Sequence, residues 1–233
     1  MNRQPIEKKS SRADVLDIHS IFHTIQGEGP FCGTPAVFIR LAGCNLQCPA
    51  CDTDYTSTRK KMPLADILAT TKTFAARGLV VITGGEPFRQ EIEKLLLLLT
   101  KHDYYVQIET NGTLAPPPGD YSTVTDRRKG LYIVCSPKAG KVNALIEGLA
   151  CCYKYVLSSD SLHADGLPLR ALKHPAAPFV ARPPKNWKLP IYVQPMDAKD
   201  EETNRQNLQA AVTSCMENGY ILQLQVHKII NME

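Results

Sequence analysis

Three cysteines lie close together in the spacing C-x3-C-x2-C. Cys44, Cys48 and Cys51 follow an apolar run that ends at Leu41. Three neighbouring thiolates can each bind one iron atom of a four-iron, four-sulfur cubane, and the fourth iron then has no protein ligand. That iron stays open to the amino and carboxylate groups of a small molecule. The spacing therefore indicates a [4Fe-4S] cluster with one exchangeable corner.

A structural zinc site is the alternative use of these cysteines. Structural zinc takes four ligands, and Cys32, twelve residues before Cys44, completes a four-cysteine set. Paired C-x2-C knuckles are the usual sign of zinc, and only one is present here, so the spacing favours the cluster. The other cysteines lie in apolar patterns, where a free thiol packs as a small hydrophobic group. We expect these four in the core: Cys135, Cys151, Cys152 and Cys215.

Four further polar motifs each follow an apolar run with the composition of a strand. They are Thr-Gly-Gly-Glu-Pro at 83–87, Glu-Thr-Asn-Gly at 109–112, Ser-Pro-Lys at 136–138 and Gln-Pro at 194–195. In parallel sheets, ligands bind at the carboxyl ends of the strands, where loops and helix N-termini converge. We therefore expect these motifs to form one shared site.

Strand-like and helix-like segments alternate along the chain and must position these motifs. Apolar and β-branched runs predict strands at 15–22, 36–41, 79–83, 105–110, 131–135, 153–157, 189–194 and 220–226. Apolar residues three to four apart predict helices at 63–77, 90–102, 141–149 and 200–218, with Gly78 and Gly219 as C-terminal caps. Because a parallel crossover needs a long, usually helical, return, this alternation predicts an α/β fold.

Composition limits the classes of partner. The chain has 233 residues, of which 43% are hydrophobic, enough for the core of one globular domain. The net charge of +4 comes from interspersed basic and acidic residues rather than a basic stripe, so we expect a small-molecule substrate and no nucleic acid. The longest strongly apolar run, 95–99, is too short to cross a bilayer, so we expect no membrane partner.

The ends and loops of the chain are also assigned from composition. Residues 1–14 are polar without the apolar core of a signal peptide, and we expect a mobile tail before a catalytic domain at 15–233. Eight cysteines without an export signal indicate a reducing compartment, so we expect a cytoplasmic protein. The Pro-rich stretches 116–119 and 175–190 predict loops, and the second has no interpretable motif.

The motifs together resemble a known family. They are Phe-His-Thr-Ile-Gln-Gly-Glu-Gly at 22–29, Cys-Asp-Thr at 51–53, Ile-Thr-Gly-Gly-Glu-Pro at 82–87, Glu-Thr-Asn-Gly-Thr at 109–113, Ser-Pro-Lys, Gln-Pro and a terminal His-Lys at 227–228. The cysteine spacing followed by Gly-Gly-Glu-Pro resembles the radical S-adenosylmethionine superfamily. The whole set, from about residue 18 to the C-terminus, resembles the 7-carboxy-7-deazaguanine synthase family within it.

The resemblance implies a fold and an activity. The fold is an incomplete TIM-type barrel of about six βα units, since a full barrel takes about 250 residues. The family converts 6-carboxy-5,6,7,8-tetrahydropterin into 7-carboxy-7-deazaguanine with loss of ammonia, in the route to queuosine and other deazapurines. An electron from the cluster held by Cys44, Cys48 and Cys51 breaks the sulfonium bond of S-adenosyl-L-methionine and yields a 5′-deoxyadenosyl radical. A reductant such as flavodoxin or ferredoxin and a homodimer are also implied.

The resemblance also assigns residues to the cofactor. Gly85 matches the segment that meets the amino end of S-adenosyl-L-methionine, where the missing β-carbon lets the backbone approach closely. Glu109 is a further candidate for the cofactor amine. The matches to the ribose and adenine end are Ser136, Pro137, Lys138, Gln194, Pro195, Met196 and Asp197. One position departs from the family, which commonly has an aromatic residue where this chain has Ala50.

The remaining assignments concern a metal ion and the substrate. Thr53 matches the residue whose hydroxyl binds a Mg²⁺ that also holds a substrate oxygen, and Mg²⁺ ordinarily takes few protein ligands and several waters. Arg40 can pair bidentately with the substrate carboxylate. The substrate contacts implied by the family are Ile25, Gln26, Gly27, Arg40, Thr83 and His227.

Two rival functions stay open at this point. One is another radical enzyme, such as an activase that makes a glycyl radical on a protein partner, whose substrate surface would lack the set of Gln26, Arg40 and Thr83. The other is a non-catalytic zinc-binding module. A small-molecule pterin substrate distinguishes the synthase from both.

Overall fold

One twisted sheet carries the residues that the computed structural model describes, which are 2–119, 121, 130–175 and 178–232. Its strands are β1 (Val15–Ile25), β2 (Pro35–Leu41), β3 (Lys60–Pro63), β4 (Gly78–Gly84), β5 (Tyr104–Thr110), β6 (Leu131–Cys135), β7 (Ala150–Leu157), β8 (Ile191–Pro195) and β9 (Ile221–Leu222). Their order is β3-β1-β2-β4-β5-β6-β7-β8-β9. β1 pairs antiparallel with β2 and β3, and the remaining pairs are parallel.

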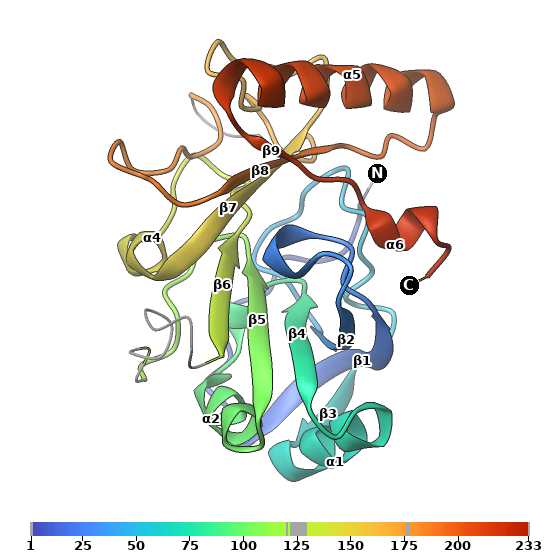
Figure 1. Cartoon of the computed structure of the whole chain (residues 1–233). Coiled ribbons are helices and arrows are strands. Elements are labelled where there is room, and N and C mark those ends of the chain that lie inside the picture. Colours follow the sequence, from blue (N-terminus) through green and yellow to red (C-terminus); the bar gives the residue numbers. More distant parts are fainter. Residues whose placement is uncertain (1, 120, 122–129, 176–177, 233) are drawn as a thin grey trace.

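Helices connect the parallel strands. They are α1 (Leu64–Phe74), α2 (Glu93–Lys101), α4 (Ala144–Leu149), α5 (Glu201–Asn218) and α6 (Val226–Ile229), with 3-10 turns η1 (Gly29–Phe31) and η2 (Pro87–Arg89). The expected α/β fold is confirmed. The sheet curves but does not close, because β3 and β9 are its two unpaired edges in the described part of the chain (Figure 1). The incomplete barrel is therefore also confirmed.

Local sequence signals explain the long helix α5, which packs against β8 and β9. Its N-cap is Asp200, whose carboxylate accepts a hydrogen bond from the Thr203 N–H at 2.9 Å. It ends at Gly219, which has the left-handed φ of 71° that glycine adopts without a β-carbon clash, as predicted. None of the described helices combines the length and the apolar character needed to cross a membrane.

The alternation of side chains in the parallel strands separates the core from the site. In β7, Tyr153 and Tyr155 are fully buried in the main hydrophobic core, and the Tyr153 ring packs edge-on against Trp187 at 4.8 Å between centroids. Successive strand residues point to opposite faces. Lys154 and Val156 therefore face the other way, toward the inside of the curved sheet.

Some expected boundaries are wrong. The first helix ends at Phe74, and Gly78 is not its cap but the first residue of β4. The predicted strand 220–226 is only the two-residue β9, and the short strand β3 was not predicted at all. β3 is exposed at three of its four positions, Met62 is its one buried side chain, and it ends in a proline, so it carries little strand signal.

The first residues of the chain have defined neighbours, in contrast to the mobile tail expected from composition. We call residues 2–10 the N-terminal segment. The Gln4 carboxamide donates to the Thr53 carbonyl at 2.9 Å, and the Glu7 N–H donates to the Cys44 carbonyl at 2.7 Å. We call the loop between β2 and β3, residues 42–59, the cysteine loop. The N-terminal segment thus forms hydrogen bonds with main-chain groups of the cysteine loop. Met1 and Glu233, the outermost residues of the expected tail and domain, and two residues of the Pro-rich stretch lie outside the described residues.

Candidate active site

A cavity of about 330 Å³ opens at the carboxyl ends of the parallel strands. Most of the site residues expected from the sequence line it: Ile25, Gln26, Arg40, Cys44, Cys48, Cys51, Thr53, Thr83, Gly85, Ser136, Lys138, Gln194, Met196, Asp197 and His227. Gly27, Pro137 and Pro195 do not line it but are chain neighbours of residues that do. Segments more than two hundred residues apart in sequence thus meet at one site.

Polar side chains on five parallel strands form the inner wall of this cavity. They are Arg40 on β2, Thr83 on β4, Glu109 on β5, Lys154 on β7 and Gln194 on β8. Arg40 and Thr83 are register partners, so they lie side by side across the β2–β4 pair. Charged and polar groups are rare in the buried centre of a parallel sheet unless they serve a ligand or each other.

The cysteine loop brings three thiols to the cavity. Cys44 and Cys48 are buried and Cys51 is half-buried. Burial raises the pKa of Cys44 to about 12 and of Cys48 to about 11, and it raises the pKa of Cys51 as well. The metal-free thiols are therefore protonated at neutral pH. Iron must displace three protons to bind here, which is ordinary for thiolate sites.

The donor set fits an iron–sulfur cubane better than a zinc ion. Cys32, the fourth ligand that zinc would need, is exposed, and its thiol contacts the Gly27 carbonyl and Gln223 rather than the cavity. Among the described residues, no group of three or more His, Cys, Asp or Glu side chains is placed to hold a single metal ion. Three thiols spaced around a cavity match a cluster with an open corner.

Gly85 shows why the cysteine loop needs a glycine beside it. A β-carbon at this position would overlap the Gly43 carbonyl oxygen and lie 2.8 Å from the β-carbon of Cys44. The loop after β4 therefore packs directly on the cysteine loop, and the Glu86 N–H donates to the Gly43 carbonyl at 3.1 Å. A larger side chain at position 85 would move the cluster ligands themselves.

Glu86 joins two segments of the site, the turn after β4 and the end of β5. Its buried carboxylate accepts hydrogen bonds from the Phe88 N–H at 3.0 Å, the Thr110 hydroxyl at 2.7 Å and the Asn111 N–H at 2.8 Å. Burial raises the pKa of Glu86, although these donors oppose the rise. The ends of β4 and β5 are thereby fixed relative to each other.

The wall expected to meet the ribose and adenine holds polar atoms that face the cavity. The Lys138 ammonium donates to the carbonyl of Ser136 at 2.7 Å and to its hydroxyl at 2.5 Å. Within the described part of the chain, the carboxamide oxygen of Gln194 is buried without a hydrogen-bond partner. A buried unpaired acceptor on a cavity wall is costly unless a ligand donates to it. This wall therefore fits a polar cofactor.

Asp197 follows β8, lines the cavity and forms an ion pair with Lys228 of α6. Burial raises its pKa, but hydrogen bonds from Lys199, Lys228 and Asn204 outweigh burial and hold the pKa below its usual range. The Lys228 ammonium lies 3.0 Å from Asp197 and 3.3 Å from Asp52 of the cysteine loop. α6 is therefore tied to the cysteine loop across the cavity mouth.

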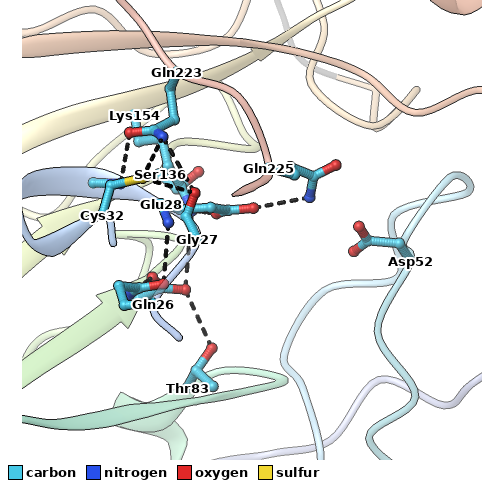
Figure 2. Close-up of polar contacts among 12 residues, drawn as sticks. Gln26, Gly27, Glu28, Cys32, Asp52, Thr83, Ser136, Lys154, Gln223 and Gln225 are labelled. Atoms are coloured by element: carbon cyan, nitrogen blue, oxygen red, sulfur yellow. Dashed lines mark hydrogen bonds and ion pairs between the residues drawn. The ribbon is translucent and has the colours of Figure 1, made fainter. Parts of the chain in front are cut away.

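Two of the substrate residues expected from the family, Gln26 and Thr83, share one hydrogen-bond partner, Glu109, and Figure 2 shows Gln26 and Thr83 close together. The Gln26 carboxamide donates to Glu109 at 3.1 Å, and the Thr83 hydroxyl lies 3.4 Å from the other oxygen of the same carboxylate. The Glu28 N–H donates to the Gln26 side chain at 3.1 Å. The loop after β1 is thus fixed against the end of β5.

Gly27 and His227, far apart in sequence, are in direct contact. A β-carbon on Gly27 would overlap the His227 ring, and the Val226 N–H donates to the Gly27 carbonyl at 3.3 Å. Gln223 also donates to that carbonyl, at 3.2 Å, as Figure 2 shows. Burial lowers the pKa of His227, which favours the neutral ring. The C-terminal segment thereby shapes the loop that the family uses for substrate.

Several cavity residues had no assigned role in the sequence: Glu28, Asp52, Lys154, Gln225 and Lys228. Lys154 had a usable signal, because it is the one charge in the apolar run 150–157, and a charge inside a buried parallel strand needs a partner. Glu28 and Lys228 stand inside the motifs that carry the family resemblance. Asp52 stands in such a motif as well, Cys-Asp-Thr at 51–53, whereas Gln225 has no such signal, since only the fold brings it to the cavity.

Comparisons with known proteins agree with this site. The model of the radical SAM superfamily matches residues 38–120. The chain is 41% identical over 230 residues to the 7-carboxy-7-deazaguanine synthase of Rhodospirillum rubrum, covering 94% of this chain and 93% of that protein. It is 38% identical to the Rickettsia prowazekii synthase, covering 94% and 89%, and 30% identical to the Escherichia coli K12 synthase, covering 92% and 98%.

A solved structure has the same fold. The crystal structure of QueE from Escherichia coli superposes with a TM-score of 0.65 and 24% sequence identity, covering 91% of this chain and 94% of that one. This similarity concerns the fold, whereas the sequence identity to the curated synthases over nearly the full length concerns the family. The chain therefore belongs to the 7-carboxy-7-deazaguanine synthase family of the radical SAM superfamily.

Proposed function

We propose that this protein converts 6-carboxy-5,6,7,8-tetrahydropterin to 7-carboxy-7-deazaguanine with loss of ammonia, as a radical SAM lyase of 7-deazapurine biosynthesis. The observation that carries the proposal is the 41% identity over 94% of the chain to a 7-carboxy-7-deazaguanine synthase. The cavity supports it, because three thiols and a separate wall of polar groups face the same space. These relatives favour the synthase over an activase that acts on a protein partner.

The roles of the residues follow from their places around the cavity. When bound, the [4Fe-4S] cluster and S-adenosyl-L-methionine supply a 5′-deoxyadenosyl radical that abstracts hydrogen from the substrate. Cys44, Cys48 and Cys51 hold the cluster. Ser136, Lys138, Gln194 and Asp197 bind the nucleoside part of the cofactor from the other side of the cavity, near Gly85.

The opposite part of the wall binds the substrate. Arg40 pairs with the pterin carboxylate through its guanidinium group, and Gln26, Thr83 and Glu109 form hydrogen bonds with the polar edge of the heterocycle. His227 packs on Gly27 and closes this end of the cavity. Fixed orientation of both reactants and exclusion of water are the contributions that the protein makes to radical chemistry.

A product assay tests the proposal. Anaerobically reconstituted protein is incubated with 6-carboxytetrahydropterin, S-adenosyl-L-methionine and a chemical reductant, and 7-carboxy-7-deazaguanine is measured by liquid chromatography and mass spectrometry. The expected result is one product per substrate consumed. Deoxyadenosine without any deazapurine would show a radical enzyme with another substrate. Zinc without iron or sulfide in anaerobically purified protein would support the zinc module instead.

We also propose that Thr53 binds Mg²⁺ through its hydroxyl, because it lies on the cavity wall beside Asp52. Few protein ligands are usual for this ion. Thr53→Ala is expected to raise the Mg²⁺ concentration for half-maximal activity by about tenfold, and Thr53→Ser by less, because serine keeps the oxygen ligand. Equal Mg²⁺ dependence of the alanine variant and the wild type would contradict this role.

The remaining properties belong to the same proposal. We propose residues 15–233 as the catalytic domain, a flavodoxin- or ferredoxin-type reductant, a homodimer and a cytoplasmic location. Eight free thiols suit a reducing compartment. Exposed apolar side chains near the C-terminus support self-association: Ile221, Leu222, Leu224, Ile229 and Ile230. Light scattering of the purified protein tests the dimer, since a monomer at micromolar concentration would contradict it.

A further inference from the structure

Lys154 places a cationic group inside the sheet and beside two carboxylates. It lies on β7, an inner strand between β6 and β8, and 7% of its side chain is exposed. Its ammonium group forms an ion pair and a hydrogen bond with Glu28 and lies 3.9 Å from Glu109. A buried lysine is costly without such partners, so its position depends on them and theirs on it.

The two carboxylates connect Lys154 to the substrate end of the cavity. Glu28 accepts a hydrogen bond from Gln225 at 2.8 Å, and Glu109 accepts from Gln26 at 3.1 Å and Gln107 at 3.0 Å. Figure 2 shows the Glu28 side chain between Lys154 and Gln225, above Gln26 and Thr83. Both carboxylates line the cavity.

The chemistry of the ligand suits two carboxylates at this place. A deazaguanine carries an amino group and a ring N–H side by side, and both are hydrogen-bond donors. Carboxylates are acceptors only, and a hydrogen bond to an ionised acceptor is about twice as strong as a neutral one. Two adjacent carboxylates also repel each other, so a cation between them is needed to keep both in one small volume.

We propose that Lys154 is a positioning residue that holds Glu28 and Glu109 in place by its charge, so that they accept hydrogen bonds from the amino-pyrimidinone edge of the substrate. The inference rests on the proposed function, because the ligand edge is that of a pterin or deazaguanine. Lys154 itself does not take part in the chemical step. Its removal is expected to weaken binding of substrate and product rather than cluster assembly.

The ionisable groups around Lys154 determine how product binding by the variants should depend on pH. Burial alone would raise the pKa of Glu28, but the charge and hydrogen bond of Lys154, with a hydrogen bond from Gln225, lower it to about 2. Without Lys154, burial dominates, so the Glu28 pKa rises and the carboxyl takes up a proton as the pH falls. The other titratable groups near the Lys154 ammonium are Glu109 on β5, Asp52 on the cysteine loop, Lys138 after β6, Cys152 on β7 and His227 on α6.

The test compares four variants with the wild type. They are Lys154→Met, which keeps the volume without the charge, Lys154→Arg, which keeps the charge, the double variant Glu28→Gln with Lys154→Met, and Lys185→Met as a control at an exposed site outside the cavity. Isothermal titration calorimetry measures binding of 7-carboxy-7-deazaguanine to the anaerobically reconstituted protein between pH 5.5 and 8. The KM and kcat for 6-carboxytetrahydropterin are measured in parallel.

Lys154→Met is expected to weaken product binding by about tenfold at pH 7, and further as the pH falls, since the charge that holds the two carboxylates in place is lost. Lys154→Arg is expected to bind within about threefold of the wild type, because the guanidinium keeps the charge. The KM of Lys154→Met for 6-carboxytetrahydropterin is expected to rise. Lys185→Met is expected to match the wild type.

Several outcomes would overturn the inference. One is product binding by Lys154→Met that equals the wild type at every pH. If Lys154→Met does not fold, the double variant decides, because it also neutralises Glu28, the carboxylate bonded directly to Lys154. It is expected to fold and to bind weakly, and wild-type affinity would contradict the inference. A wild type that makes no deazapurine would instead overturn the proposed function and this inference together.

Discussion

The three thiols of the cysteine loop differ from ordinary cysteines because they are buried or half-buried, and burial outweighs the opposing charge of Lys138 on Cys48 and Cys51. Burial raises the pKa of Cys44, Cys48 and Cys51, so the metal-free thiols are weak nucleophiles at neutral pH. Iron binding therefore converts an inert set of thiols into thiolates. Cys32, by contrast, is exposed, and its thiol forms hydrogen bonds with the Gly27 carbonyl and the Gln223 side chain.

Cys48→Ala is expected to abolish the cluster. Two thiolates hold a cubane much less tightly than three, so iron content and deoxyadenosine formation should both fall below about a tenth of the wild type. Iron and sulfide analysis and the electron paramagnetic resonance spectrum, with and without S-adenosyl-L-methionine, measure the effect. Cys32→Ser is the matched control and should keep the full cluster. A loss of iron in Cys32→Ser equal to that in Cys48→Ala would favour a four-cysteine zinc site.

At the scale of the elements, contacts between strand ends and loops hold the site together. Glu86 fixes the end of β4 to the end of β5, and Gly85 packs the same turn on the cysteine loop. On the other side, α6 reaches the cysteine loop through Lys228 and Asp52. The hydrogen bonds of Glu86 are buried, whereas the Lys228–Asp52 ion pair is partly exposed, so the two contacts differ in strength.

Glu86→Ala is expected to destabilise the fold by about 3 kcal/mol, because three buried donors lose their acceptor. Urea unfolding followed by circular dichroism measures this change. Glu201→Ala, at an exposed position in the first turn of α5, is the control and should change stability by less than about 1 kcal/mol. A similar loss of unfolding free energy in both variants would argue against the proposal that Glu86 fixes β4 to β5.

Lys228→Met is expected to raise the KM for S-adenosyl-L-methionine by about threefold to tenfold, because it frees α6 from Asp52 and Asp197. The half-exposed ion pairs contribute little stability, so the unfolding temperature should change by no more than about 4 °C. Lys199→Met is the comparison, since Lys199 pairs with Asp197 and, in the described part of the chain, forms no ion pair or hydrogen bond with Asp52. Equal KM values in Lys228→Met and the wild type would exclude a role for the bridge.

The elements were predictable where one local signal decides them. The strands β2, β4, β5 and β6 have apolar runs bounded by polar motifs, and they were found within one residue of their observed bounds. α6 was missed because Val226–Ile229 has the composition of a strand, and its helix depends on contacts with the distant Gly27 loop. In the same way, motifs located Arg40 and Thr83, whereas Lys154 gains its partners only when β7 meets the loop after β1.

At the scale of the whole molecule, the sheet is an open trough whose polar inner face is covered by loops from both ends of the chain. The N-terminal segment pairs with the cysteine loop, and α6 is linked to the same loop through Lys228 and Asp52, so the two ends of the chain meet at one site; Figure 1 shows both termini on the same side of the molecule. Glu7 pairs with Arg59 and, at 3.3 Å, with Arg89, and these pairs fasten the segment beside Cys44.

Deletion of residues 2–10 is expected to leave the sheet folded and to speed the loss of the cluster in air several-fold, because the cysteine loop loses the hydrogen bonds that fix it. Decay of the cluster absorbance after exposure to air measures this rate, and circular dichroism checks the fold. Lys9→Ala is the control, since Lys9 makes only an exposed contact with Ala115 at 3.4 Å. Equal decay rates in the deletion variant and the wild type would show that the segment gives no protection.

The Glu86 hydrogen bonds and the Lys228 ion pairs differ in strength, and this difference affects how ligands enter and leave the cavity. The side of the cavity formed by η2 and the cysteine loop rests on the buried Glu86, while α6 has no fully buried residue and is held by its contacts with Gly27 and by the partly exposed ion pairs of Lys228. Local opening follows the weakest contacts. We therefore expect α6 to swing outward during each turnover, which would make departure of the finished heterocycle, rather than the radical step, sensitive to salt.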